Sequence, residues 1–131
     1  MTHPFAAPND YDDDKLKEEC AIFGIYGSEE ANVLTALGLH ALQHRGQEAC
    51  GIVTFDGRHF HAHRGLGHVG ENFNANSEHM DALAGHVGIG HNRYSTSGKT
   101  NPFLEIQPFS SRLAFGGFAL AHNGNLTNAA R

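Results

Sequence analysis

CAIFGIYG, residues 20–27, is the first apolar stretch of the chain, and its alternating apolar residues predict a buried strand over residues 21–26. It follows YDDDKLKEE, residues 11–19, an acidic, lysine-containing stretch that belongs to a solvated leader, residues 1–19. Cys20 stands at the boundary. Removal of the leader would give this residue a thiol and a free α-amine, and an amine with a pKa of about 8 is able to activate a thiol. The boundary therefore predicts a nucleophile that cleavage switches on.

Composition excludes several classes of protein. The chain has 131 residues, enough for one domain or a piece of one, and its net charge of −5 without a basic stripe does not support nucleic-acid binding. It has no apolar run near the ~18 residues of a membrane span and no hydrophobic core of a secretory signal. Two cysteines, Cys20 and Cys50, form no disulfide framework. We therefore expect a cytoplasmic protein that is not bound to a membrane.

A helix is expected between Ser28 and His44. Ser28 would cap its N-terminus, and Glu29 and Glu30 would favour the positive end of its dipole. Gly46 would end it. Apolar residues at helical spacing are predicted to face the core, namely Val33, Leu34, Leu37, Ala41 and Leu42.

Further along, the sequence predicts a hairpin in which Asp56-Gly57 joins residues 51–55 and 58–64. The remaining expected elements are a short helix over 77–84 between Ser77 and Gly85, a strand over 87–93, a polar loop over 95–101, a strand over about 113–121 and a helix after Leu126. No cap, Gly or Pro marks Arg131 as a helix end. The pattern predicts an α+β domain that is cut short.

Four motifs occur in order along the chain. Alone, each has an ordinary structural interpretation: a Cys beside a strand packs in a core, and Asn-Gly forms a turn. The motifs are CAIFGI (20–25), LQHRGQEACGI (42–52), GHNRYST (90–96) and AHNGNLTN (121–128). Together they resemble the glutaminase domain of the N-terminal-nucleophile, or class II, glutamine amidotransferases.

This resemblance implies the N-terminal-nucleophile hydrolase fold, a four-layer αββα sandwich in which two antiparallel sheets lie between helices. Residues 1–19 would be a propeptide that is removed autocatalytically. Residues 20–131 would be the N-terminal, incomplete part of a type-2 glutamine amidotransferase domain.

The same resemblance implies three catalytic residues. Cys20 would attack the side-chain amide of glutamine, with its own α-amine as the base. The Asn123 side-chain amide and the Gly124 backbone N–H would form the oxyanion hole.

Three further residues match positions that bind glutamine. Arg93 would grip the α-carboxylate, a role that suits a planar guanidinium better than a lysine. Thr96 would help to close the pocket, and Arg45 would organise the site near the nucleophile. The family's aspartate for the α-amine would lie beyond Arg131, and no metal site is expected in this chain.

Within the family, the leader and the QHRGQ stretch favour the members that start purine synthesis. These members pass ammonia to phosphoribosyl pyrophosphate and form 5-phosphoribosylamine, the first committed step of IMP synthesis. Mg²⁺ would accompany this substrate in a phosphoribosyltransferase domain outside the chain. Some relatives with propeptides carry an iron–sulfur cluster, whose cysteines would also lie downstream. A homo-oligomer is expected for the intact enzyme.

Three alternatives stay open. A glutamate synthase-like enzyme of the same class also carries a propeptide. A metal-binding module is suggested by His59, His61 and His63, which alternate along one strand, and by His40 and His44, one helical turn apart. The isolated fragment would have little activity of its own, because missing strands would leave open sheet edges and exposed apolar faces.

Overall fold

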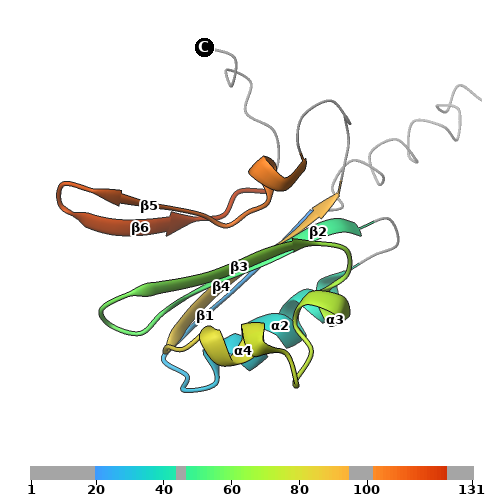
Figure 1. The fold of residues 1–131 in the computed structure, drawn as a ribbon, viewed down its shortest axis with the longest axis horizontal. Coiled ribbons are helices and arrows are strands. Elements are labelled where there is room, and N and C mark those ends of the chain that lie inside the picture. Colours follow the sequence, from blue (N-terminus) through green and yellow to red (C-terminus); the bar gives the residue numbers. More distant parts are fainter. Residues whose placement is uncertain (1–19, 44–46, 95–101, 124–131) are drawn as a thin grey trace, which may run out of the picture.

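The computed structural model describes residues 20–43, 47–94 and 102–123 (Figure 1). A four-stranded antiparallel sheet has the order β1-β4-β2-β3, and β5 and β6 form a second, two-stranded sheet. Helices cover one face of the larger sheet, and the smaller sheet lies on its other side. The elements are β1 (Ala21–Tyr26), α2 (Ala31–Leu42), β2 (Gln47–Phe55), β3 (Phe60–Leu66), α3 (Val69–Asn72), α4 (Glu78–Ala82), β4 (Val87–Tyr94), the 3₁₀ turn η1 (Pro102–Glu105), β5 (Phe109–Leu113) and β6 (Gly116–Leu120). The predicted α+β class is confirmed.

Strand β4 is central in the larger sheet and brings its two neighbours into register. Ala21 of β1 pairs with Asn92, and Ile52 of β2 pairs with Gly90. Helix α2 lies close to β4, since a Cβ on Gly90 would be 2.7 Å from Leu39 Cδ1. Glycine is therefore required where the helix crosses the strand.

The core lies between the larger sheet and the helices. Asn92, which is fully buried, donates a side-chain hydrogen bond of 2.8 Å to the Leu39 carbonyl oxygen and ties β4 to α2. The buried apolar cluster consists of Ala36, Leu39, Cys50, Ile52, Val69, Phe73, Met80 and Leu83. The opposite face of the larger sheet, on the side of the smaller sheet (Figure 1), carries His91 and Arg93 together with apolar residues such as Val53. In the described part of the chain, no helix is long and apolar enough to span a membrane.

The first helix differs from its prediction in start and in face. It begins at Ala31, and Ser28 Oγ accepts the Glu30 N–H at 3.2 Å in the turn before it, without capping the helix. The residues that α2 buries are Ala31, Thr35, Ala36 and Leu39, whereas Val33 and Leu37 are 41% and 59% exposed. This face is selected because Gly88 and Gly90 of β4 leave room for Thr35 and Leu39 to approach the sheet closely. The helix was also predicted to run to about His44, whereas α2 ends at Leu42. Residues 44–46, which include the predicted terminator Gly46, lie outside the described residues.

Of the other predicted elements, some are confirmed and one is wrong. The strand over 21–26, the strand over 87–93 and the hairpin at Asp56-Gly57 are confirmed. Ser77 caps α4, accepting the Met80 N–H at 3.3 Å. The single strand expected over 113–121 is wrong, because residues 109–120 form the β5–β6 hairpin, which turns just before Gly116 (φ +134°). Helix α3 was not predicted. The loop over 95–101 and the helix after Leu126 lie outside the described residues.

Candidate active site

The Cys20 thiol lies at the end of the sheet where β1 begins and β4 ends. Its Sγ is 4.0 Å from the carbonyl oxygen of Tyr94. Ala21 of β1 pairs with Asn92 of β4. If this antiparallel register is extended by one residue, Cys20 lies opposite Arg93. Side chains at directly opposite positions share a face of the sheet. The sequence-predicted nucleophile and the predicted carboxylate-binding arginine therefore come together.

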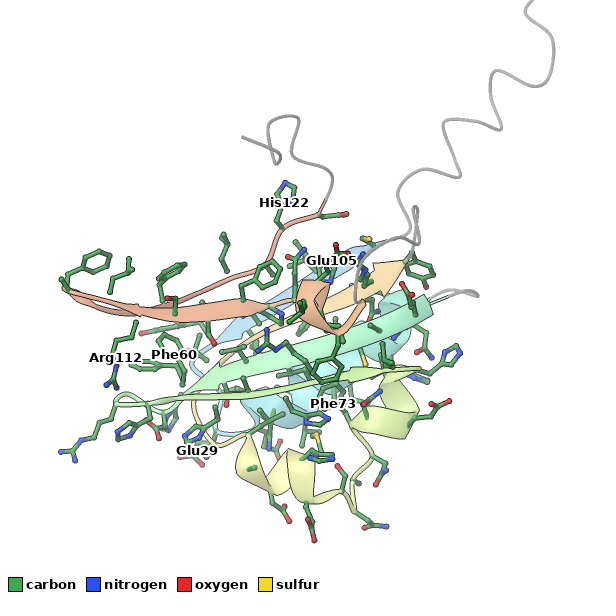
Figure 2. The ribbon with its side chains drawn as sticks, turned by 45° about the horizontal axis from the view of Figure 1, so that its top comes forward. Glu29, Phe60, Phe73, Glu105, Arg112 and His122 are labelled. Atoms are coloured by element: carbon green, nitrogen blue, oxygen red, sulfur yellow. The ribbon has the colours of Figure 1, made fainter. Side chains whose placement is uncertain are left out.

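Carboxylates surround the Arg93 guanidinium on two sides. Nη1 donates a hydrogen bond of 3.0 Å to the Glu105 carbonyl oxygen, and Nη2 contacts the carboxylate of the same residue. Nε lies 3.7 Å from Glu48 Oε2. Glu105 belongs to η1, on the side of the sheet opposite the helices (Figures 1 and 2). The arginine is thus already paired within the protein.

Glu48 reaches Arg93 from a bulge in β2. Gln47 pairs with Tyr94 and Ala49 pairs with Arg93, so Glu48 is the extra residue between two successive pairs. A bulge of this kind re-aims a side chain and is frequent beside active sites. Glu48 Oε2 and Arg93 Nε are buried and make no hydrogen bond, so the 3.7 Å ion pair is their interaction.

His91 lies two residues before Arg93 on β4 and is 1% exposed. Burial lowers its pKa to about 4, and the nearby charges of Arg93 and His122 act in the same direction, although the His122 backbone opposes them. The ring is therefore neutral at pH 7. Neither ring nitrogen has a well-formed hydrogen bond.

The segment that ends at Asn123 lies against this part of β4. The backbone N–H of His122 donates to Gln107 Oε1, and the His122 backbone faces the His91 ring. The His122 side chain itself points away from the sheet (Figure 2). Asn123, predicted to supply an oxyanion donor, directly follows this anchored residue.

Three predicted site residues, Arg45, Thr96 and Gly124, lie outside the described residues, so their roles stay predictions. Sequence reasoning missed Glu48, inside the LQHRGQEACGI motif, and it also missed His91, inside the GHNRYST motif. Position within a motif was a usable signal for both.

Cys50 differs from Cys20 in its surroundings. It is fully buried, and its Sγ donates to the Gly67 carbonyl oxygen at 3.8 Å. Desolvation raises the pKa of this thiol to about 12. Because the thiolate is the nucleophilic form, Cys50 is inert and packs as a small core residue.

The histidines of β3 are engaged with other side chains. His61 Nε2 lies 2.8 Å from Asp56 Oδ2, and the His63 ring stacks on His79 with 3.7 Å between centroids. Across residues 20–43, 47–94 and 102–123, no group of three His, Cys, Asp or Glu side chains is arranged to hold a metal ion. The His61 and His63 side chains thus have other partners, and His44 of the predicted His40–His44 pair lies outside the described residues.

A cavity of about 620 Å³ lies between the β2–β3 hairpin and the smaller sheet. Phe60 and Arg112, labelled in Figure 2, face it from the two sides. Its lining contains neither Cys20 nor Arg93. It is thus separate from the candidate active site.

No protein-family model matches the chain. Among curated proteins, the amidophosphoribosyltransferase of Rhizobium etli is 50% identical over 128 residues, which cover 98% of this chain and 25% of that protein. The chloroplastic amidophosphoribosyltransferase of Vigna aconitifolia is 47% identical over 127 residues, which cover 97% of this chain and 25% of that protein. The chain matches the N-terminal part of the amidophosphoribosyltransferases. It spans about a quarter of the length of these relatives.

Solved structures agree with this match. The glutamine phosphoribosylpyrophosphate amidotransferase of B. subtilis, complexed with ADP and GMP, superposes with a TM-score of 0.70 at 45% identity. A structure described as the allosteric regulatory enzyme of purine biosynthesis gives 0.73 at 47% identity. Each match covers 83% of this chain and 23% of the solved one. The chain therefore has the N-terminal-nucleophile hydrolase fold of the amidophosphoribosyltransferases, as its sequence motifs predicted.

Proposed function

We propose that the chain is the glutaminase part of an amidophosphoribosyltransferase. It hydrolyses glutamine and delivers the ammonia to phosphoribosyl pyrophosphate, which yields 5-phosphoribosylamine and pyrophosphate and begins IMP synthesis. The observation that carries the proposal is the position of the Cys20 thiol beside the strand that holds Arg93, in a chain that is 50% identical to a named relative over nearly its whole length.

The chemistry begins with removal of residues 1–19. The freed α-amine of Cys20 takes the thiol proton, and the sulfur attacks the carbon of the glutamine side-chain amide. The Asn123 side-chain amide and the Gly124 N–H stabilise the oxyanion. The tetrahedral intermediate collapses, the α-ammonium returns its proton to the leaving nitrogen, and ammonia departs from a thioester. Water then hydrolyses the thioester, which releases glutamate and restores the thiol.

Substrate binding depends on Arg93. Arg93 lies near the end of β4 and directly precedes Tyr94, whose carbonyl oxygen contacts the Cys20 thiol. An α-carboxylate bound there would leave the rest of the glutamine chain to extend toward the sulfur. Thr96 and Arg45 complete the pocket in this proposal.

The leader belongs to the region of similarity. The match to the Rhizobium etli protein covers 98% of this chain, so it includes nearly all the residues before Cys20. We place a propeptide at residues 1–19 and the glutamine amidotransferase domain from residue 20 onward. Autocatalytic cleavage between Glu19 and Cys20 makes the nucleophile and its base in one step.

The transfer of ammonia to phosphoribosyl pyrophosphate needs a domain that corresponds to the part of the relatives outside the matched quarter. A phosphoribosyltransferase domain would bind phosphoribosyl pyrophosphate with Mg²⁺, and the intact enzyme would be a homo-oligomer. The absence of a disulfide framework favours the cytoplasm. The Vigna aconitifolia relative is named chloroplastic, so the compartment differs among relatives.

The test compares two nitrogen sources in the full-length protein. Cys20→Ala should abolish the formation of phosphoribosylamine from glutamine and leave the formation from free ammonia intact. Cys50→Ala, which removes the inert thiol, serves as the matched control and should keep both activities. Glutamine-dependent activity in Cys20→Ala would refute the proposal.

A further inference from the structure

We propose that Glu48 and Glu105 are positioning residues that hold the Arg93 guanidinium in place for the α-carboxylate of glutamine. The inference rests on the proposed function, because it assigns these carboxylates to the same substrate site. It names two residues from distant parts of the chain, neither of which was among the predicted site residues.

The contacts come from two directions. Glu105 accepts from both terminal nitrogens of Arg93, at Nη1 through its carbonyl oxygen and at Nη2 through its carboxylate. Glu48 faces Nε at 3.7 Å. Each terminal nitrogen of a guanidinium carries two N–H groups. Glu105 accepts from one N–H on each nitrogen, so a second N–H on each can donate to a ligand.

Both carboxylates lie beside residues that the fold holds in place. Glu48 sits on the bulge of β2, directly beside the pair Ala49–Arg93. Glu105 is followed by Ile106, which is fully buried and whose carbonyl oxygen accepts from Arg64 Nη1 of β3 at 3.4 Å. Contacts from two separate segments of the fold therefore meet at the Arg93 guanidinium.

The partial exposure of the Arg93 and Glu105 side chains argues against a large contribution of their ion pair to stability. The side chains of Arg93, Glu48 and Glu105 are 20%, 31% and 39% exposed. Ion pairs that water reaches contribute little to the free energy of unfolding. Their larger effect is on orientation, because an arginine already held in one rotamer loses less conformational entropy when a substrate binds.

The test uses glutamine hydrolysis by the full-length protein. Glu48→Gln and Glu105→Gln remove the charge and keep the size of the side chain. Each should raise KM for glutamine by about tenfold, as expected for weakening one charge-assisted contact. The kcat should stay within a factor of about three, because no contact made only in the transition state is removed. Glu29→Gln, an exposed residue at the opposite end of the sheet (Figure 2), is the matched control and should leave both constants unchanged.

A substrate without the α-carboxylate separates positioning from a structural role. Hydrolysis of 4-aminobutanamide should be as fast in the Glu48 and Glu105 variants as in the wild type, because Arg93 has nothing to grip. Equal losses with both substrates, or an unchanged or lower KM for glutamine, would overturn the inference. Glu48→Asp and Glu105→Asp keep the charge but shorten the side chain, and their KM for glutamine should lie between those of the wild type and the Gln variants. They test the inference if a Gln variant fails to fold.

The inference and the proposed function fail in distinguishable ways. If Cys20→Ala keeps glutamine-dependent activity, the proposed function is wrong. If Cys20→Ala loses that activity but the Glu48 and Glu105 variants keep the wild-type KM, only the positioning role is wrong.

Discussion

The Cys20 thiol lies 4.0 Å from the carbonyl oxygen of Tyr94, the residue that follows Arg93 on β4. This contact joins the start of β1 to the end of β4, two segments that are far apart in the sequence. It brings the proposed nucleophile to the residue that we propose binds the substrate carboxylate. The geometry of the site therefore depends on the register of these two strands.

Replacement of Arg93 by lysine should weaken glutamine binding. A lysine keeps the positive charge but loses the planar donors that bind a carboxylate at two points. We expect KM for glutamine to rise about tenfold or more, as for the loss of a charge-assisted hydrogen bond. Ammonia-dependent activity should not change. Steady-state kinetics with Arg58→Lys, an exposed arginine at the hairpin tip, as control would show this. A parallel fall in both activities would contradict the assigned role.

Replacement of Asn123 by alanine should slow turnover more than it weakens binding. The side-chain amide would stabilise charge that develops only in the tetrahedral intermediate. Loss of one such donor typically lowers kcat by about 10²–10³. Asn76→Ala, at an exposed position in the turn before α4, is the control. A change confined to KM in single-turnover and steady-state assays would remove Asn123 from the oxyanion hole.

Replacement of Gly90 by alanine should destabilise the protein. The added Cβ would be 2.7 Å from Leu39 Cδ1 and 2.8 Å from Thr35 Cγ2, so these buried side chains of α2 would have to shift. Overpacking of this kind costs about 1–3 kcal/mol in the free energy of unfolding. Gly70→Ala meets no atom within 4 Å and is the matched control. Denaturant unfolding that gave equal stability for the two variants would disprove the close helix–sheet contact.

His91 should make stability depend on pH. Burial lowers its pKa to about 4 in the folded protein, below the usual value of 6.5, so the unfolded chain binds the proton more readily. Its contribution is fully present above pH 6.5, is lost as the pH falls toward 4, and amounts to at most about 3 kcal/mol.

The measurement is the free energy of unfolding between pH 7 and pH 4 for the wild type and for His91→Gln. Because other groups also titrate in this range, the comparison is the difference between the two slopes. The His91→Gln protein should lose less stability on acidification. Identical slopes would show that His91 is not buried in its neutral form.

The parts of the fold that the sequence predicted correctly are those set by local pattern. β1 was predicted from its alternating apolar residues, and the strand predicted over 87–93 is β4. Helix α2 was assigned to the wrong face, because its apolar spacing favours Val33 and Leu37 whereas the glycines of β4 select Thr35 and Leu39 for the contact. A helix face is chosen by its neighbour as well as by its own hydrophobicity.

The motifs predicted residues for the site, and these roles stay predictions, but they did not predict the carboxylates that contact Arg93. The motifs gave Cys20, Arg93 and Asn123. The carboxylates around Arg93 come from a bulge and from a turn in a different part of the chain. Local sequence does not show that Glu105 meets an arginine of β4, since only the folded chain brings η1 to that strand. Supporting residues of this kind have to be read from tertiary contacts.

The most direct test of the proposed function is the intact mass and N-terminal residue of the purified full-length protein. We expect residues 1–19 to be absent and Cys20 to be the first residue, with the mass lowered by that segment alone. Retention of Met1 in a protein that hydrolyses glutamine would leave Cys20 without a free α-amine and would contradict the proposed mechanism.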